Sequence, residues 1–296
     1  LSALTPEDQT SINQLIDRYN QLTDEEKAQV TNGKTLQEAA ENLQKLLAEA
    51  KSTETKTITI SVEKFVLGQG YVMEPMEVQL TTEMNYAQVL DDVFAKQGLQ
   101  YSHTGTLGSN FYLSGIENAD NGQTKVPQEL IDFSGNDALK NATNQFGSTL
   151  REFSYTPMSG WLYSVNNDFP GVGMGSKKPE DGDVFRVQFS LVGYGADLGN
   201  GGTGTFAIAD KLALTKKIGE INQDAAAWQA QGTAYQAAYQ FAMTQLTDLT
   251  ASQALVDQAL AGLENPATTP EKDPVEAVKQ LIQNLGEIHD LAQKQQ

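Results

Sequence analysis

The sequence lacks cysteine altogether, and its 296 residues include only two histidines, His103 and His289. Without cysteine there is no disulfide, no thiol nucleophile and no cysteine-ligated zinc, and two histidines are too few for a histidine-rich metal site. No apolar run reaches about 18 residues, so the sequence predicts no transmembrane helix. We expect the protein to hold neither a metal nor another cofactor.

Positive charge is also scarce: 20 Lys and Arg residues stand against 38 Asp and Glu residues, for a net charge of −18. Nucleic-acid binding requires a basic footprint, so nucleic acid is excluded as a partner. Catalytic signatures are missing as well. No Gly-x-Ser-x-Gly elbow occurs, and His103 lies in a segment that we predict to be a polar loop. We therefore expect a protein that is not an enzyme.

The length suggests about two domains, and composition changes along the chain divide it into three segments. Residues 1–53 have helical spacing, with capping-box patterns at Thr23–Glu26 and Thr35–Glu38. Residues 54–204 mix strand and helix patterns and end in the glycine-rich stretch Gly199–Gly204. Residues 205–296 are helical again. We predict a helical spacer, an α+β domain and a helical bundle or spacer segment, in that order.

The middle segment carries both structural periods. Ile58, Ile60 and Val62 alternate with polar residues, which predicts a half-buried strand. Asn85 and Gly98 are typical cap residues for a helix between them. Strands, one helix and then more strands predict an α+β fold, with a small mixed or antiparallel sheet and one helix packed on it.

The C-terminal segment reads as successive helices. One pattern runs through Ala234–Leu246, and Thr250–Gln253 resembles a capping box that opens another. Asn265-Pro266 and Thr269-Pro270 interrupt the chain. A last helix is predicted from apolar residues at helical spacing, namely Val275, Val278, Leu281, Ile282 and Leu285.

Four stretches of the middle segment resemble a known family: Gly160–Asn166, Phe169–Gly173, Glu180–Val187 and Asp197–Gly199. In this order they are similar to the transcobalamin-like C-terminal domains of bacterial surface proteins, which are related to the β-domain that closes over cobalamin in its carriers. The resemblance covers residues of about 55–200 and implies an α+β fold. The carriers add a large barrel of helices that this chain lacks, so the resemblance implies the fold more strongly than cobalamin binding.

The flanking segments resemble helical repeats of Gram-positive surface proteins. Tyr19–Asn32 is similar to the linker between two helices of such a repeat, and Pro274–Ile288 to the first helix of the next one. Thr250–Leu263 resembles small helical modules between surface domains. Repeats of this kind space domains apart. The chain begins at Leu1 without a signal segment, so we expect it to be a piece of a longer protein.

Aromatic residues concentrate around one predicted hairpin and make it the best candidate for a ligand site. Trp161, Tyr163 and Phe169 could stack on a sugar or another planar ring, and Asn166 and Asn167 could supply hydrogen bonds. The alternative for the aromatics is core packing, because a strand buries one of its faces.

Other loops offer weaker candidates. Gly171–Lys178 lacks the Gly-Lys-Ser/Thr spacing of a phosphate loop and is predicted to be a hairpin loop. Asp181–Asp183 lacks the ligand pattern of a calcium loop and is predicted to be a tight turn. Glu117–Gly122 and Asp197–Asn200 are also rich in oxygen ligands, so calcium stays an alternative there.

These observations together predict a non-enzymatic, extracellular binding or adhesion module of a bacterial cell-surface protein. Its localisation would be extracellular or cell-wall-associated in a Gram-positive organism. Its partner would be a small molecule, a glycan or a protein. Two alternatives stay open: a purely structural spacer or stalk segment, and a corrinoid-binding module.

Overall fold

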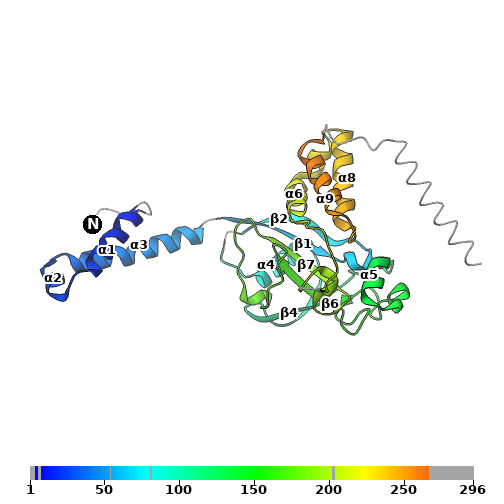
Figure 1. The fold of residues 1–296 in the computed structure, drawn as a ribbon, viewed down its shortest axis with the longest axis horizontal. Helices are drawn as coiled ribbons and strands as arrows, with labels where there is room; N and C mark the ends of the chain where they lie inside the picture. The colour runs from blue at the N-terminus through cyan, green and yellow to red at the C-terminus, as the bar shows by residue number, and fades with distance from the viewer. Residues whose placement is uncertain (1–3, 6–7, 54, 81, 202–203, 267–296) are drawn as a thin grey trace, which may run out of the picture. The chain divides into compact units, whose positions relative to one another are not determined.

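The computed structural model describes residues 4–5, 8–53, 55–80, 82–201 and 204–266 (Figure 1). These residues form two compact units, and each is treated by itself. The first contains residues 1–56 and 79–84, and the second contains residues 57–78 and 85–296. Within the described ranges, no helix combines the length and apolar character that membrane crossing requires.

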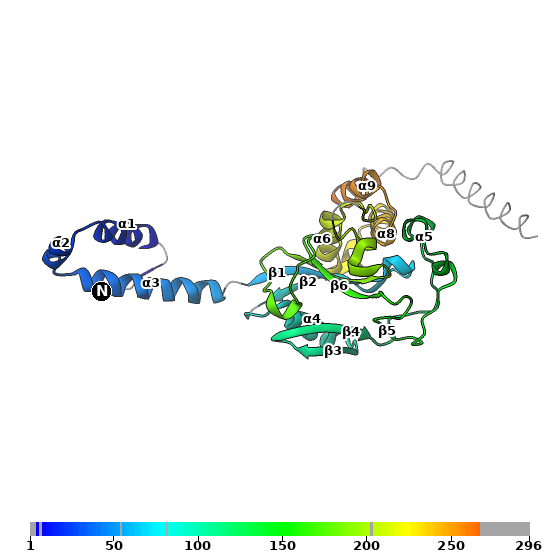
Figure 2. The same cartoon turned by 60° about the horizontal axis from the view of Figure 1, so that its bottom comes forward.

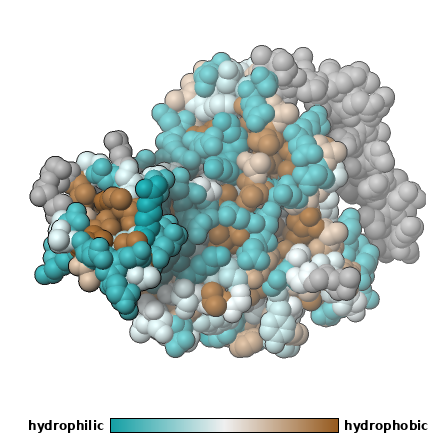
Figure 3. Space-filling view, turned by 60° about the vertical axis from the view of Figure 1, so that its left-hand side comes forward, coloured by the Kyte–Doolittle hydropathy of each residue, from teal (hydrophilic) through white to brown (hydrophobic). Residues whose placement is uncertain are grey.

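The first unit is a helical hairpin. Helices α1 (Gln9–Asn20) and α3 (Gly33–Thr53) pack through Ile12, Ala39 and Leu43, with the short helix α2 (Asp24–Gln29) between them in sequence. Its apolar side chains gather in a patch ringed by hydrophilic ones (Figure 3). The capping box predicted at Thr23 and Glu26 is confirmed. The box predicted at Thr35 is wrong, because α3 already begins at Gly33.

A four-stranded mixed sheet forms the centre of the second unit, in the order β2-β1-β7-β6. Its strands are β1 (Lys56–Glu63), β2 (Tyr71–Leu80), β6 (Gly160–Val165) and β7 (Val184–Ser190). Strand β7 runs parallel to β1 and antiparallel to β6. Helix α4 (Tyr86–Gln97) lies against one face through Tyr86, whose ring centroid is 4.7 Å from that of Phe185. The predicted α+β architecture with flanking helices is confirmed.

A second sheet has three strands, in the order β3-β4-β5. Strands β3 (Tyr101–Thr106) and β4 (Ser109–Ile116) form an antiparallel hairpin. Strand β5 (Leu150–Arg151) pairs only with the last two residues of β4 (Figure 2). Between β4 and β5 lies the short helix α5 (Gln128–Ser134). The histidine predicted to lie in a polar loop, His103, is instead in β3, with its ring stacked 5.1 Å from that of Phe111.

The C-terminal helices pack against the other face of the four-stranded sheet (Figures 1 and 2). They are α6 (Leu212–Ile221), α7 (Ala225–Gln229), α8 (Thr233–Thr247) and α9 (Gln253–Glu264). Their shared core includes Leu214, Ile218, Ala242, Leu246 and Ala259, with Tyr71 of β2 packed against it. The helix predicted around Val275–Leu285 lies outside the described residues.

This packing overturns the prediction that β1 is half-buried. Its polar residues Thr59, Ser61 and Glu63 are as buried as its apolar ones, each at most 2% exposed. Alternation correctly identified the strand but not the environment of its polar face, because helices that begin about 150 residues later in the sequence cover that face. The predicted division into residues 1–53, 54–204 and 205–296 concerns independent folding and stays a prediction.

Candidate functional site

A groove lies between β4 of one sheet and β6 of the other, with a volume of about 380 Å³. Its walls come from Phe111–Leu113 of β4, Trp161–Tyr163 of β6 and the loop residues 169–174, with Tyr194 and Asn200 at its edge. This volume is in the lower part of the range for small-ligand pockets, about 300–1,000 Å³. No residue that lines the groove carries a charge.

The floor of the groove is rigid and aromatic. Trp161 is 3% exposed, donates its Nε1–H to the carbonyl of Leu150 at 2.9 Å, and packs edge-on against Phe189. Tyr163 is 9% exposed and donates its hydroxyl to the carbonyl of Val172 at 2.6 Å. Burial raises the pKa of Tyr163 to about 12, so its hydroxyl stays a donor at neutral pH. Both side chains are therefore packed parts of the groove wall and expose little surface to solvent.

The most exposed large side chain at the groove is Tyr194, 85% of whose surface is accessible. It lies between Gly193 and Gly195 in the 3-10 segment Gly193–Leu198, and its backbone has φ = 59°. A bulky residue in this left-handed region is strained, by about 1–3 kcal/mol. Strain of this kind persists only where the surrounding structure imposes it.

A buried carboxylate braces the start of this loop. Asp197 is fully buried and accepts hydrogen bonds from the Ser190 hydroxyl (2.6 Å) and from the backbone N–H groups of Leu191 (2.6 Å) and Val192 (3.2 Å). Burial raises the pKa of Asp197, while these donors oppose that shift. Asn200 adds a hydrogen bond of 2.7 Å to the carbonyl of Tyr194 itself. The loop is therefore braced on both sides of the exposed ring.

The sequence-predicted site residues separate into two groups. Trp161, Tyr163 and Phe169 all line the groove. Asn166 and Asn167 instead form the turn after β6, both with positive φ. Asn166 donates to Asp183 at 2.7 Å and Asn167 to Asp210 at 2.7 Å, so both side chains serve local structure.

Sequence reasoning missed Phe111, Tyr112 and Tyr194. Nothing in the sequence placed Phe111 and Tyr112 opposite Trp161. Tyr194 had a usable signal, because glycine on both sides of an aromatic residue indicates a turn or bulge and not a regular strand.

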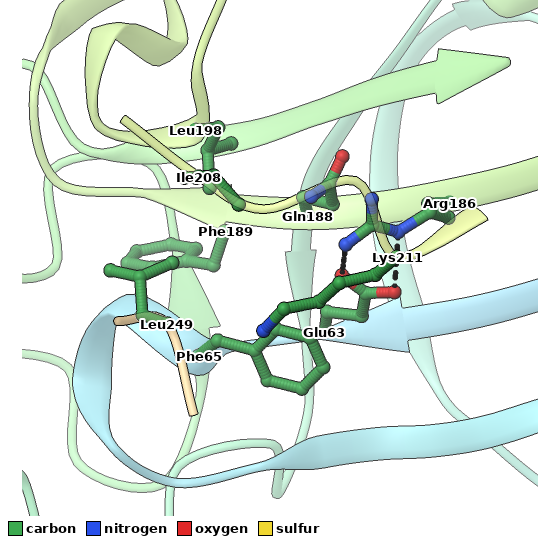
Figure 4. Close-up of a pocket in the computed structure, with 9 residues that line it drawn as sticks. All are labelled: Glu63, Phe65, Arg186, Gln188, Phe189, Leu198, Ile208, Lys211 and Leu249. Atoms are coloured by element: carbon green, nitrogen blue, oxygen red, sulfur yellow. Dashed lines mark hydrogen bonds and ion pairs between the residues drawn. The ribbon is translucent and has the colours of Figure 1, made fainter. Parts of the chain in front are cut away.

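A second, smaller cavity of about 20 Å³ lies where the C-terminal helices meet the sheet (Figure 4). Glu63 and Arg186 form a two-bonded ion pair beside it, at 2.7 and 2.8 Å. The ammonium group of Lys211 points away from this pair and donates to the carbonyls of Leu246 and Asp248. Burial, together with the nearby Arg186 charge, lowers the pKa of Lys211 to about 8. A cavity of this size has room for about one water molecule and not for a ligand. The cluster therefore serves to join the C-terminal segment to the sheet.

The carboxylates of the oxygen-rich loops accept hydrogen bonds from other groups of the protein. Asp120 accepts from Gln69, Gly122, Asn144 and Tyr155. Asp181, which lies in a turn, accepts a hydrogen bond of 2.8 Å from the backbone N–H of Thr57 in β1. Among the residues that the structure describes, no group of three or more acidic or histidine side chains could hold a metal ion.

Comparisons with known proteins add little. No protein-family model matches the sequence, and no curated protein matches it. A solved structure from Ruminococcus gnavus, described as a "putative metal binding protein", is 12% identical and covers 46% of this chain and 96% of its own, with a TM-score of 0.22. A similarity this low carries no argument about fold or function.

Proposed function

We propose that this protein is a non-enzymatic binding module whose ligand occupies the groove between β4 and β6. The observation that carries the proposal is Tyr194, an almost fully exposed aromatic ring held in a strained conformation beside an aromatic groove. A solvent-exposed ring gains nothing from folding, whereas a ligand that covers it would gain contact area. The brace from Asp197 pre-organises the ring and so lowers the ordering entropy of binding.

The lining sets the chemistry of the ligand. Because no described residue that lines the groove carries a charge, a ligand with a net charge at the contact would lose hydration without compensation. Aromatic faces favour flat apolar surfaces, and the tyrosine hydroxyls and backbone groups supply hydrogen bonds. We propose an uncharged ligand segment: the face of a sugar ring, a planar ring or an apolar side chain.

The proposed setting is the surface of a Gram-positive bacterium. It is supported by the resemblance of residues 55–200 to transcobalamin-like C-terminal domains and of the flanks to surface-protein repeats. In that setting the sheet unit would present its groove from a longer chain.

A thermal melt of the full chain against a ligand panel tests the proposal. The panel contains cobalamin and related corrinoids, neutral oligosaccharides, calcium and uncharged peptides. A ligand that binds only the native state raises the melting temperature as it saturates the site. We expect a shift from an uncharged panel member and none from calcium.

A paired melt of Tyr194→Ala and Leu255→Ala locates the effect. Leu255 is 40% exposed in α9 and does not line the groove, so its removal should leave the ligand shift intact. Tyr194→Ala should reduce it. No shift across the panel would favour the spacer role instead, and a corrinoid shift that survives Tyr194→Ala would place the site elsewhere.

A further inference from the structure

Exposed apolar side chains border the groove. Tyr112, Val172 and Tyr194 line it, and 40%, 52% and 85% of their surfaces are accessible. Met158, which is 57% exposed, extends this border next to Tyr194. We call Tyr112, Met158, Val172 and Tyr194 the rim. Taking about 200 Å² for a large side chain, the rim exposes roughly 400 Å², which is as much as the largest apolar patch of a typical monomer.

The side chains of the rim adjoin one another across small residues. The thioether of Met158 lies over Gly193, at a place where a Cβ atom would collide with it, and Tyr194 follows directly in the chain. The hydroxyl of Tyr112 lies 3.4 Å from the position of a Cβ atom on Gly160, two residues after Met158. The exposed rings and the thioether therefore form one continuous surface.

This surface is neutral on a strongly acidic protein. The chain has a net charge of −18, yet no described residue that lines the groove is charged. Beside the rim, Arg151 and Glu152 bring opposite charges to within 4.0 Å of each other. In a twofold contact, side chains near the axis meet their own copies, so an acidic face would repel itself. The rim avoids that repulsion, and it offers no acidic group to a cationic partner.

A projecting ring and a hollow lie next to each other on this surface. Tyr194 stands at the edge of a groove of about 380 Å³. A cavity of about 150 Å³ already holds a benzene ring, so the groove has room for the ring of a tyrosine. A surface binds its own copy when it is self-complementary, and a ring beside a hollow meets this condition. A twofold axis between the two brings each ring over the groove of the other copy.

We infer that the ligand of the groove is a second copy of this chain, with Tyr194 of each copy inserted into the groove of the other. The inference rests on the proposed function and names its partner. Two rims together would cover roughly 800 Å² before their neighbours are counted, which is the size of a weak and reversible complex. The dimer should therefore form at high protein concentration and dissociate on dilution.

Sedimentation equilibrium of the full chain, from about 10 µM to about 1 mM, tests the inference. We expect the weight-average mass to rise toward twice the 32.1 kDa of one chain. Tyr194→Ala removes a ring from both symmetric contacts, so its dissociation constant should be higher by about tenfold or more. Leu255→Ala, which does not alter the groove, should behave as the native protein does. A native chain that stays monomeric, or a dimer that Tyr194→Ala leaves unchanged, overturns the inference.

Salt gives a second readout of the same contact. Two copies that each carry a charge of −18 repel each other, and salt screens this repulsion. Raising the concentration of NaCl from about 50 mM to about 500 mM should therefore strengthen the dimer severalfold. A dimer that salt weakens would be held together by ion pairs, which contradicts an uncharged contact.

A photo-cross-link locates the contact. p-Benzoyl-phenylalanine in place of Tyr194 keeps an aromatic ring at the rim, and a mixture of isotope-labelled and unlabelled chains separates links between copies from links within one copy. We expect links between copies at residues that line the groove, such as Tyr112, Val172 and Met174. Links between copies that fall on helices α6–α9 or on the first helical unit would overturn the inference.

The failure of this inference is distinguishable from that of the proposed function. If the chain stays monomeric but a member of the ligand panel raises the melting temperature through Tyr194, self-association is wrong and the binding function stands with a different ligand. If the chain stays monomeric and no panel member responds, both fall together.

Discussion

At Tyr194, the requirements of stability and of ligand binding oppose each other. Its φ of 59° is unfavourable for a tyrosine, and its ring buries almost nothing in the free protein. Glycine adopts this conformation without strain. We expect Tyr194→Gly to raise the free energy of unfolding by roughly 1 kcal/mol, as measured by urea denaturation.

The same substitution should weaken binding of the groove ligand by roughly fivefold, because stacking on an exposed ring contributes about 1 kcal/mol. A titration of the ligand identified by the panel checks this. A Tyr194→Gly protein that is less stable than the native one would show that the ring contributes to the fold and that the strain argument is wrong.

The lowered pKa of Lys211 predicts that the free energy of unfolding depends on pH. Its pKa is lowered to about 8 in the folded protein from an ordinary value of 10.5. Between these values the unfolded chain holds a proton that the folded chain has released, so stability rises with pH in that window. Relative to Lys211→Met, the free energy of unfolding of the native protein should rise by roughly 1 kcal/mol per pH unit between pH 8 and 10.

Chemical denaturation of both proteins at pH 7, 8, 9 and 10 measures that difference. Tyrosines that titrate in the same window cancel in the comparison. Parallel stability profiles for the two proteins would contradict a shifted Lys211.

Sequence reasoning at this scale found aromatic residues but could not assign them roles. Trp161 and Tyr163 were correctly placed in one strand, yet their burial depends on Leu150 and Val172, which approach through tertiary contacts. Local patterns carry no information about such partners. Tyr194 differs, because the residues that hold its loop, Asp197 and Asn200, lie close to it in the sequence.

At the scale of elements, the contact between α6 and β1 is unusually close. A Cβ atom on Gly219 would lie 2.7 Å from the Cγ2 of Thr59, although alanine is the better helix former by about 1 kcal/mol. The steric clash should outweigh the gain in helix propensity, because a regular helix and a regular strand cannot easily move apart. We expect Gly219→Ala to lower the free energy of unfolding by about 1–3 kcal/mol.

A double-mutant cycle with Thr59→Ser gives the control. Serine lacks the methyl group that a new Cβ would meet, so Thr59→Ser should largely rescue Gly219→Ala while costing little alone. Equal effects of Gly219→Ala in both backgrounds would mean that the two elements do not touch as described.

The elements that could be predicted from the sequence are those with a clear hydrophobic period or with helix-capping residues. Alternation located β1, and the capping residues Asn85 and Gly98 bounded α4. Strand β5 has two residues and no period, so no pattern could reveal it. The groove therefore could not be predicted from the sequence, although several of its residues could.

At the scale of the whole molecule, polar bonds join the C-terminal helices to the sheet. Asn222 donates to the carbonyl of Pro75 at 2.8 Å, and Gln223 to that of Glu77 at 3.0 Å. We expect a fragment of residues 54–266 to melt cooperatively. A fragment of residues 54–204 should melt at a lower temperature, because it exposes Thr59, Ser61 and Glu63.

Calorimetry and near-ultraviolet circular dichroism of the two fragments check this expectation. Equal melting temperatures would show that residues 205–266 fold independently of the sheet, as the composition of the sequence suggested. Composition records where helices begin, but not which surface they cover.

Hydrogen–deuterium exchange of the full chain, with and without the ligand that raises its melting temperature, tests the central claim most directly. We predict slower exchange at the amides of Phe111–Leu113 and Trp161–Tyr163, the two walls of the groove, with the first helical unit unchanged. Protection confined to that helical unit, or to the helices α6–α9, would contradict a binding site between β4 and β6.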